Sequence, residues 1–138
     1  MLNYLRAFII ALIAHWGQKD KGGHPYFFHP FRVSRDVKHL RVKVVALLHD
    51  VLEDSEKFDF SDFYFLDEEQ KEAIKLLTHN KSVDYFDYIQ EVKKNMIARE
   101  VKLADLNDNM NLSRLKEITE KDKKRYDKYK TAKNCLLN

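Results

Sequence analysis

Apolar positions recur with helical spacing along most of the chain. Near its beginning they repeat at intervals of three and four residues, which places them on one helical face: Leu5, Phe8, Ile9, Leu12, Ile13 and Trp16. We interpret this face as buried in the core. Gly17 offers a stop for the helix, and a polar loop is expected over residues 19–25.

The same spacing predicts further helices over about residues 29–39, 41–53, 68–78, 84–95, 97–111 and 119–136. Pro30 suits the first turn of a helix, and Asp67 is a good N-cap before acidic residues. The segment 58–66 is aromatic without a helical period, so a packed loop is expected there. Residues 1–138 are therefore predicted to form one all-α domain, a helical bundle.

Composition supports this fold class. The 138 residues can form one domain with a real core but have no room for a comfortable second one. Only three glycines and two prolines are present, and a many-stranded sheet would need more turn residues.

Charge and cysteine content restrict the class of function. A net charge of +3 suits an anionic substrate but is too weak to indicate nucleic acid binding. The basic residues after Asn111 are interleaved with acids and are interpreted as a solvated helix face. Cys135 is the only cysteine, and the apolar run 8–14 is too short to span a membrane. A cytoplasmic protein without membrane partners is expected.

Three short segments carry candidate chemistry. An apolar helix abruptly presents four ionisable groups, His49, Asp50, Glu53 and Asp54, which a metal or a polar cleft must receive. Asp105 follows small and apolar residues, with Asn109 one turn further on. The third segment places His29 among aromatic residues at a helix start. The remaining histidines are interpreted as ordinary core or surface residues: His15, His24, His39 and His79. Lys102, one turn before Asp105, could supply positive charge near the cleft but is interpreted as a plain surface lysine.

Together these segments resemble the HD superfamily, whose signature is H…HD…D, and more specifically the hydrolase domain of RelA/SpoT-type alarmone enzymes. The matching stretches are 14–30, 46–54 and 101–110. The resemblance implies an all-helical HD-type domain and one divalent ion, manganese in that branch. It implies His29, His49, Asp50 and Asp105 as the ligands. It further implies Glu53 and Asp54 as the catalytic pair, and nucleotide contacts from Lys21 and Asn109.

The chemistry of these residue types is consistent with that assignment. Two imidazoles and two carboxylates suit manganese, iron, zinc or cobalt, and the sequence does not choose among them. Such an ion acidifies water and polarises a phosphoryl oxygen. A nearby carboxylate can shuttle the proton, and Glu53 is the first choice for that role.

The chain departs from the alarmone pattern at several positions. That branch has a basic pair where this chain has Asp20 and Lys21, and the first basic residue helps to hold the guanine base. The arginine and histidine that often follow the last metal aspartate are replaced by Leu106 and Asp108.

Three functions therefore stay open. The first is removal of the 3′-pyrophosphate from guanosine penta- or tetraphosphate. The second is hydrolysis of another nucleotide, such as a nucleoside monophosphate or a nicotinamide dinucleotide phosphate. The third is a non-catalytic module that binds a nucleotide or a partner. The intact ligand set and Glu53 favour an enzyme acting on a small nucleotide.

Overall fold

The computed structural model describes residues 1–138 and contains helices but no β-strand. Eight α-helices are joined by loops and two short 3-10 helices, with these bounds: α1 Leu2–Ala14, α2 Phe28–Arg35, α3 Leu40–Leu48, α4 Val51–Asp54, η1 Phe60–Phe63, α5 Glu68–Leu77, α6 Tyr85–Lys93, α7 Met96–Asn109, η2 Leu112–Arg114 and α8 Glu120–Leu137. The prediction of an all-α, single-domain bundle is confirmed. No helix has the length and apolarity needed to cross a membrane.

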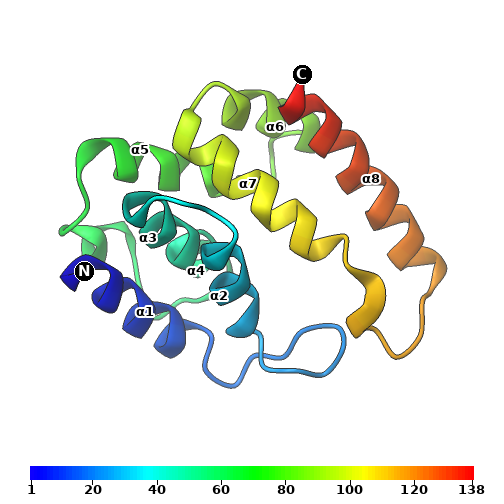
Figure 1. Cartoon of the computed structure of the whole chain (residues 1–138), viewed down its shortest axis with the longest axis horizontal. Helices are drawn as coiled ribbons and strands as arrows, with labels where there is room; N and C mark the ends of the chain where they lie inside the picture. The colour runs from blue at the N-terminus through cyan, green and yellow to red at the C-terminus, as the bar shows by residue number, and fades with distance from the viewer.

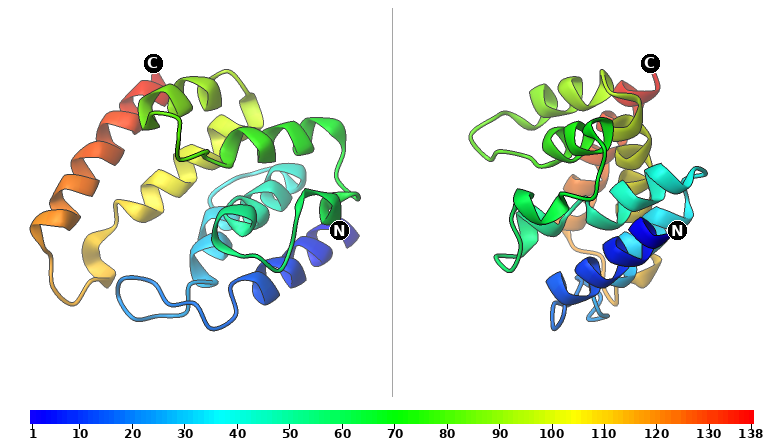
Figure 2. Two further views of the ribbon diagram at one scale, coloured as in Figure 1. Left: turned by 180° about the vertical axis from the view of Figure 1, so that it is seen from behind. Right: turned by 90° about the vertical axis from the view of Figure 1, so that its left-hand side faces the viewer.

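Helix α3 is the centre of the fold. It packs against α1, α2, α5 and α7, and its residues from Val44 to Leu48 are all buried. Helix α8 lies along the outer side of the molecule against α6 and α7 (Figure 1). Seen from behind, the loops that follow α1 and α7 meet at the end of the bundle opposite the C-terminus (Figure 2). The cleft described below forms at this end.

Side-chain caps explain why several helices start where the pattern predicts. Asp67 accepts from the backbone N–H of Gln70, whose side chain accepts in return from the N–H of Asp67. Thr119 and Asp122 form the same reciprocal capping box at α8. Each box satisfies backbone donors that the first helical turn leaves without partners.

Two local predictions are wrong. The helix expected over 41–53 is interrupted after Leu48, and α4 begins only at Val51. On α1, the predicted buried face is largely exposed: Leu5, Ile9, Ile13 and Trp16 are 47–74% exposed. The buried side of α1 instead carries small residues, Ala7, Ala11 and Ala14, because α1 packs closely on α3.

Candidate metal centre and adjoining cleft

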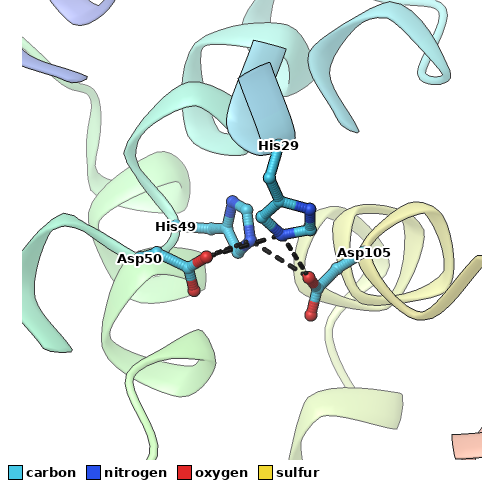
Figure 3. Close-up of side chains that lie close together, drawn as sticks. All are labelled: His29, His49, Asp50 and Asp105. Carbon is cyan, nitrogen blue, oxygen red and sulfur yellow. Dashed lines mark hydrogen bonds and ion pairs between the residues drawn. The ribbon is translucent and has the colours of Figure 1, made fainter. Parts of the chain in front are cut away.

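Four predicted ligands from three separate segments converge in the interior. His29 lies on α2, His49 and Asp50 lie in the break between α3 and α4, and Asp105 lies on α7 (Figure 3). One ligand atom from each lies within 4.8 Å of the others. Nε2 of His29 lies 2.8 Å from Oδ1 of Asp105, and Nε2 of His49 lies 3.1 Å from Oδ2 of Asp50. The arrangement offers two nitrogens and two oxygens to one ion.

The two imidazoles are held from behind through Nδ1. In His49, Nδ1 donates to the backbone carbonyl of Ala46, 2.5 Å away, in the last turn of α3. In His29, Nδ1 donates to Oδ2 of Asp108 at 2.7 Å. Each ring is therefore left with Nε2 directed at the cluster. Outer acceptors of this kind fix the tautomer of metal-binding histidines in proteins.

His49 and Asp50 lie in the break between α3 and α4. Nδ1 of His49 bonds to the carbonyl of Ala46 in the last turn of α3, at the point where that helix ends. Asp50 then accepts from the hydroxyl of Tyr26 at 2.6 Å. The sequence pattern showed Tyr26 as part of the resemblance but gave it no role.

Asp105 is held by residues one turn away on its own helix. Lys102 Nζ lies 2.9 Å from Oδ2, and Asn109 Nδ2 donates to Oδ1 at 3.1 Å. The interpretation of Lys102 as a plain surface lysine is wrong, since its side chain is only 14% exposed and its ammonium also lies over the ring of Tyr88. Sequence spacing offered one clue, because residues three apart on a helix are neighbours.

Opposite charges shift the titration of the cluster strongly. Burial alone would lower the pKa of His29, but hydrogen bonds to Asp105 and Asp108 outweigh it and raise that pKa to about 9. The pKa of His49 is likewise raised, because the charge of Asp50 outweighs burial. Burial opposes the ionised form of Asp105, yet the charge of Lys102 and the hydrogen bond from His29 hold its pKa well below its usual range. The metal-free cluster is thus a network of ion pairs.

The predicted catalytic acids lie at the rim of this cluster. Glu53 and Asp54 are both exposed, and Oε1 of Glu53 accepts from the backbone N–H of His79 at 2.6 Å. Although both side chains reach solvent, the surrounding protein partly removes water from their carboxyl groups. This desolvation, together with the negative charge of Asp50, raises the pKa of both carboxyls. Neither acid is among the four ligands. Glu53 and Asp54 therefore hold a proton more tightly than the inner acids, Asp50 and Asp105, do.

A cleft of about 230 Å³ opens beside the cluster at the end of the bundle. Tyr26, His29 and Asn109 are among the residues that line it, and His29 also belongs to the cluster. Its lining also contains five cationic side chains and three carboxylates: Lys19, Lys21, Arg32, Arg114 and Arg125, with Asp20, Asp108 and Asp122. The excess of cations suits an anionic ligand.

The structure places both predicted substrate contacts, Lys21 and Asn109, on the lining of this cleft. Asp20 is engaged within its own loop, where Oδ1 accepts from the backbone N–H groups of Gly22 and His24, both at 2.9 Å. The loop also packs tightly, because a Cβ on Gly22 would meet the carbonyl of Arg114 at 2.4 Å. Asp20 therefore shapes the loop that presents Lys21.

Helix α8 contributes one wall of the cleft through Arg125, Tyr126 and Tyr129. The interpretation of this basic segment as a solvated face holds for its exposed lysines but is wrong for this side of the helix. Tyr129 follows Tyr126 by three residues and Arg125 by four, a spacing that the surrounding lysines obscured.

The other four histidines lie outside the cluster of predicted ligands. His15 is buried and paired through Nδ1 with Gln18, and His79 stacks on Tyr88. His24 and His39 are exposed.

Comparison with known proteins gives two informative similarities. No family profile matches the chain. A 53-residue stretch, 36% of the chain, is 40% identical to a guanosine-3′,5′-bis(diphosphate) 3′-pyrophosphohydrolase of Vibrio cholerae, of which it covers 8%. The whole chain superposes on 86% of a solved structure described as a metazoan ortholog of SpoT that hydrolyzes ppGpp, with a TM-score of 0.81 and 23% identity. The latter similarity shows the fold, which this chain shares.

Proposed function

We propose that this chain is a metal-dependent phosphohydrolase that removes the 3′-pyrophosphate from guanosine 3′,5′-bis(diphosphate). The observation that carries the proposal is the convergence of His29, His49, Asp50 and Asp105 beside a cation-lined cleft. The names of the two similar proteins support the choice of substrate. The proposed hydrolase domain spans residues 1–138 and acts in the cytoplasm.

The donor set fits a divalent ion. Two nitrogens and two carboxylate oxygens are the ligands expected for manganese, iron, zinc or cobalt. Both imidazoles already have an acceptor on Nδ1, and the carboxylates of Asp50 and Asp105 balance the charge of a dication. We propose manganese as the resident ion, on the resemblance to the alarmone branch. When bound, it supplies Lewis acidity that polarises a phosphoryl oxygen and acidifies water.

The acids at the rim are proposed to move the proton. Hydrolysis requires that water lose a proton as its oxygen attacks phosphorus, and a carboxylate near the cluster can receive it. Glu53 is suited to this role because its raised pKa makes it a better base than the inner acids. Its bond to the N–H of His79 fixes its position. Asp54, next along the chain, is its proposed partner.

The cleft is proposed to bind the nucleotide. A ribose with pyrophosphate groups on both the 3′ and 5′ sides carries more negative charge than one dication can neutralise. Lys21 supplies positive charge from the cleft, and Asn109 contacts Asp105 and the cleft together. Because Asp20 occupies the position of a base-contacting residue in the alarmone branch, base recognition falls to other parts of the cleft.

A nucleotide panel tests the proposal. Protein loaded with Mn²⁺ is incubated with guanosine tetraphosphate, nucleoside monophosphates and nicotinamide dinucleotide phosphates, and products are separated by ion-exchange chromatography. We expect pyrophosphate and guanosine diphosphate in equal amounts from guanosine tetraphosphate. If this nucleotide stays intact while another is cleaved, the broader HD phosphohydrolase function replaces the proposal. If none is cleaved but one binds, the chain is a non-catalytic module.

A further inference from the structure

A buried carboxylate outside the ligand set connects the metal cluster to the wall of the cleft. Asp108 lies on α7 one turn after Asp105 and is only 8% exposed. Its Oδ2 accepts from Nδ1 of His29 at 2.7 Å. Asp108 is one of the positions at which the chain departs from the alarmone pattern, so the resemblance assigns it no role.

Two arginines hold this carboxylate in place. Arg32 reaches it in a forked arrangement, with Nε 2.8 Å from Oδ1 and Nη2 3.1 Å from Oδ2. Arg114 lies 3.3 Å from Oδ1 and also donates to the backbone carbonyl of Asp108 at 2.8 Å. Paired guanidinium contacts of this type are strong and orient the carboxylate. The Oδ2 that meets His29 is therefore fixed from α2 and from η2 together.

The contacts of Asp108 determine which nitrogen of His29 faces it. Its Oδ1 lies against Nε of Arg32, and its Oδ2 lies against both Nη2 of Arg32 and Nδ1 of His29, so both oxygens meet N–H donors. An ionised carboxylate only accepts hydrogen bonds. Nδ1 must therefore be the donor, and Nε2 is left to face Asp50 and Asp105.

We infer that Asp108, clamped by Arg32 and Arg114, is a positioning residue that holds His29 in the tautomer and orientation that a metal ion requires. The inference builds on the metal centre of the proposed function but does not depend on the substrate. Asp108 does not join the ligands, because it contacts the opposite nitrogen of the ring. It acts through His29 alone.

The same contacts are also compatible with a purely structural role for Asp108. Asp108 joins α2 to α7 and η2, so its loss can loosen the fold without touching metal affinity. The two roles differ in their dependence on His29. If Asp108 acts through the imidazole, removing the imidazole abolishes the effect of Asp108 on metal affinity. If Asp108 acts only through packing, the effect persists.

A double-mutant cycle separates these roles. Dissociation constants for Mn²⁺ and Zn²⁺ are measured by competition with a chromophoric chelator for wild type, Asp108→Asn, His29→Ala and the double variant. Removal of outer-shell partners weakens metal binding about 10- to 100-fold, and we expect this for Asp108→Asn. In the His29→Ala background the same substitution should change metal affinity less than about twofold. The difference between the two backgrounds is the coupling between Asp108 and His29, which is expected to be large because the two residues are in contact.

Asp122→Asn is the matched control. Asp122 is a buried carboxylate on the same cleft, paired with Arg125, and it touches no predicted ligand. We expect its metal affinity to match wild type even where its melting temperature falls. If Asp108→Asn does not fold, Arg32→Gln, which frees Asp108 while leaving it present, takes its place in the cycle.

The inference is overturned if Asp108→Asn binds metal as tightly as wild type, or if its effect is the same with and without His29. These readouts need no substrate. If the protein cleaves guanosine tetraphosphate but Asp108 and His29 show no coupling in metal affinity, only the inference about Asp108 is wrong. If the two residues are coupled but the protein cleaves no nucleotide, only the proposed function is wrong.

Discussion

The inner carboxylates and the rim carboxylates stand close together in sequence but titrate in opposite directions. Asp50 is half-buried against His49 and has a lowered pKa, whereas Glu53, three residues on, has a raised pKa. The pKa of Asp105 is lowered like that of Asp50, and the pKa of Asp54 is raised like that of Glu53. Carboxyl groups in one part of the site thus lose their protons readily, and those in another part retain them more strongly.

The difference comes from the nearest charges rather than from burial itself. Burial raises the carboxyl pKa in both groups, but only the inner acids contact a cation, which more than cancels it. The rim acids experience the negative charge of Asp50 instead. Environments that separate pKa values in this way assign different roles to neighbouring acids. The inner acids suit metal binding, and the rim acids suit proton transfer.

The largest expected effect is loss of the metal from Asp105→Asn. A neutral amide replaces a charged ligand, so we expect metal affinity to fall by more than the roughly 100-fold seen when an outer partner is removed. Elemental analysis measures how much metal the purified protein and the variant retain. Equal metal occupancy in wild type and variant would show that Asp105 is not a ligand.

Stability must be controlled in that experiment, because Asp105→Asn leaves the buried ammonium of Lys102 without its partner. Breaking a buried ion pair from one side costs about 3–5 kcal/mol. The double variant Asp105→Asn/Lys102→Met removes both charges. It should recover much of the stability and still fail to bind metal.

A second effect should separate turnover from metal binding at Glu53. Glu53→Gln keeps its size and its acceptor for the N–H of His79 but no longer receives a proton. We expect kcat to fall about 10²- to 10⁴-fold, with metal affinity close to wild type. Glu56→Gln, an exposed neighbour, serves as the control. Near-normal turnover in Glu53→Gln would transfer the role to Asp54.

The smallest effect concerns pH and the metal-free protein. The raised pKa values of His29 and His49 contribute stability below their unfolded value of about 6.5, and this contribution is lost as pH rises through about 9 for His29. The lowered pKa of Asp108 contributes stability above about 3.8, which is lost as pH falls toward about 2. We expect the apo melting temperature to be highest between these limits.

The alkaline side of this profile is the sharper test. The melting temperature of apo protein should fall between pH 6.5 and 9, and His49→Gln should flatten that fall. The exposed His39 provides the control, and His39→Gln should keep the wild-type profile. Metal requires neutral imidazoles, so stabilisation by added Mn²⁺ should increase over the same range. A wild-type profile that is flat from pH 6 to 9 would contradict the ion-pair network.

Much of the fold could be predicted from the sequence, because local rules operate where the helices begin. Asp67 and Thr119 cap α5 and α8 at the expected positions. The break after Leu48 was missed because apolar residues continue past it as Val51 and Leu52. At the break the side chain of His49 bonds to the carbonyl of Ala46, a contact that periodicity does not show. Helix α1 is apolar on more than one side, so spacing alone did not show that its alanine face is the buried one.

The residues of the candidate site could also be predicted only in part from the sequence. The four residues that the resemblance named as ligands come from separate segments, and the structure brings them together. Asp108 and Arg32 were not assigned roles, because the partners of Asp108 lie 76 and 79 residues away in sequence. Lys102 was interpreted as a surface residue although its partner, Asp105, is only three residues away.

The decisive experiment is a crystal structure of the Mn²⁺-loaded protein with anomalous scattering data. We predict one anomalous peak per chain, bonded to Nε2 of His29 and His49 and to carboxylate oxygens of Asp50 and Asp105. Glu53 should lie near the ion without bonding to it. A peak held instead by Glu53 and Asp54, or no peak between the two histidines, would contradict the account.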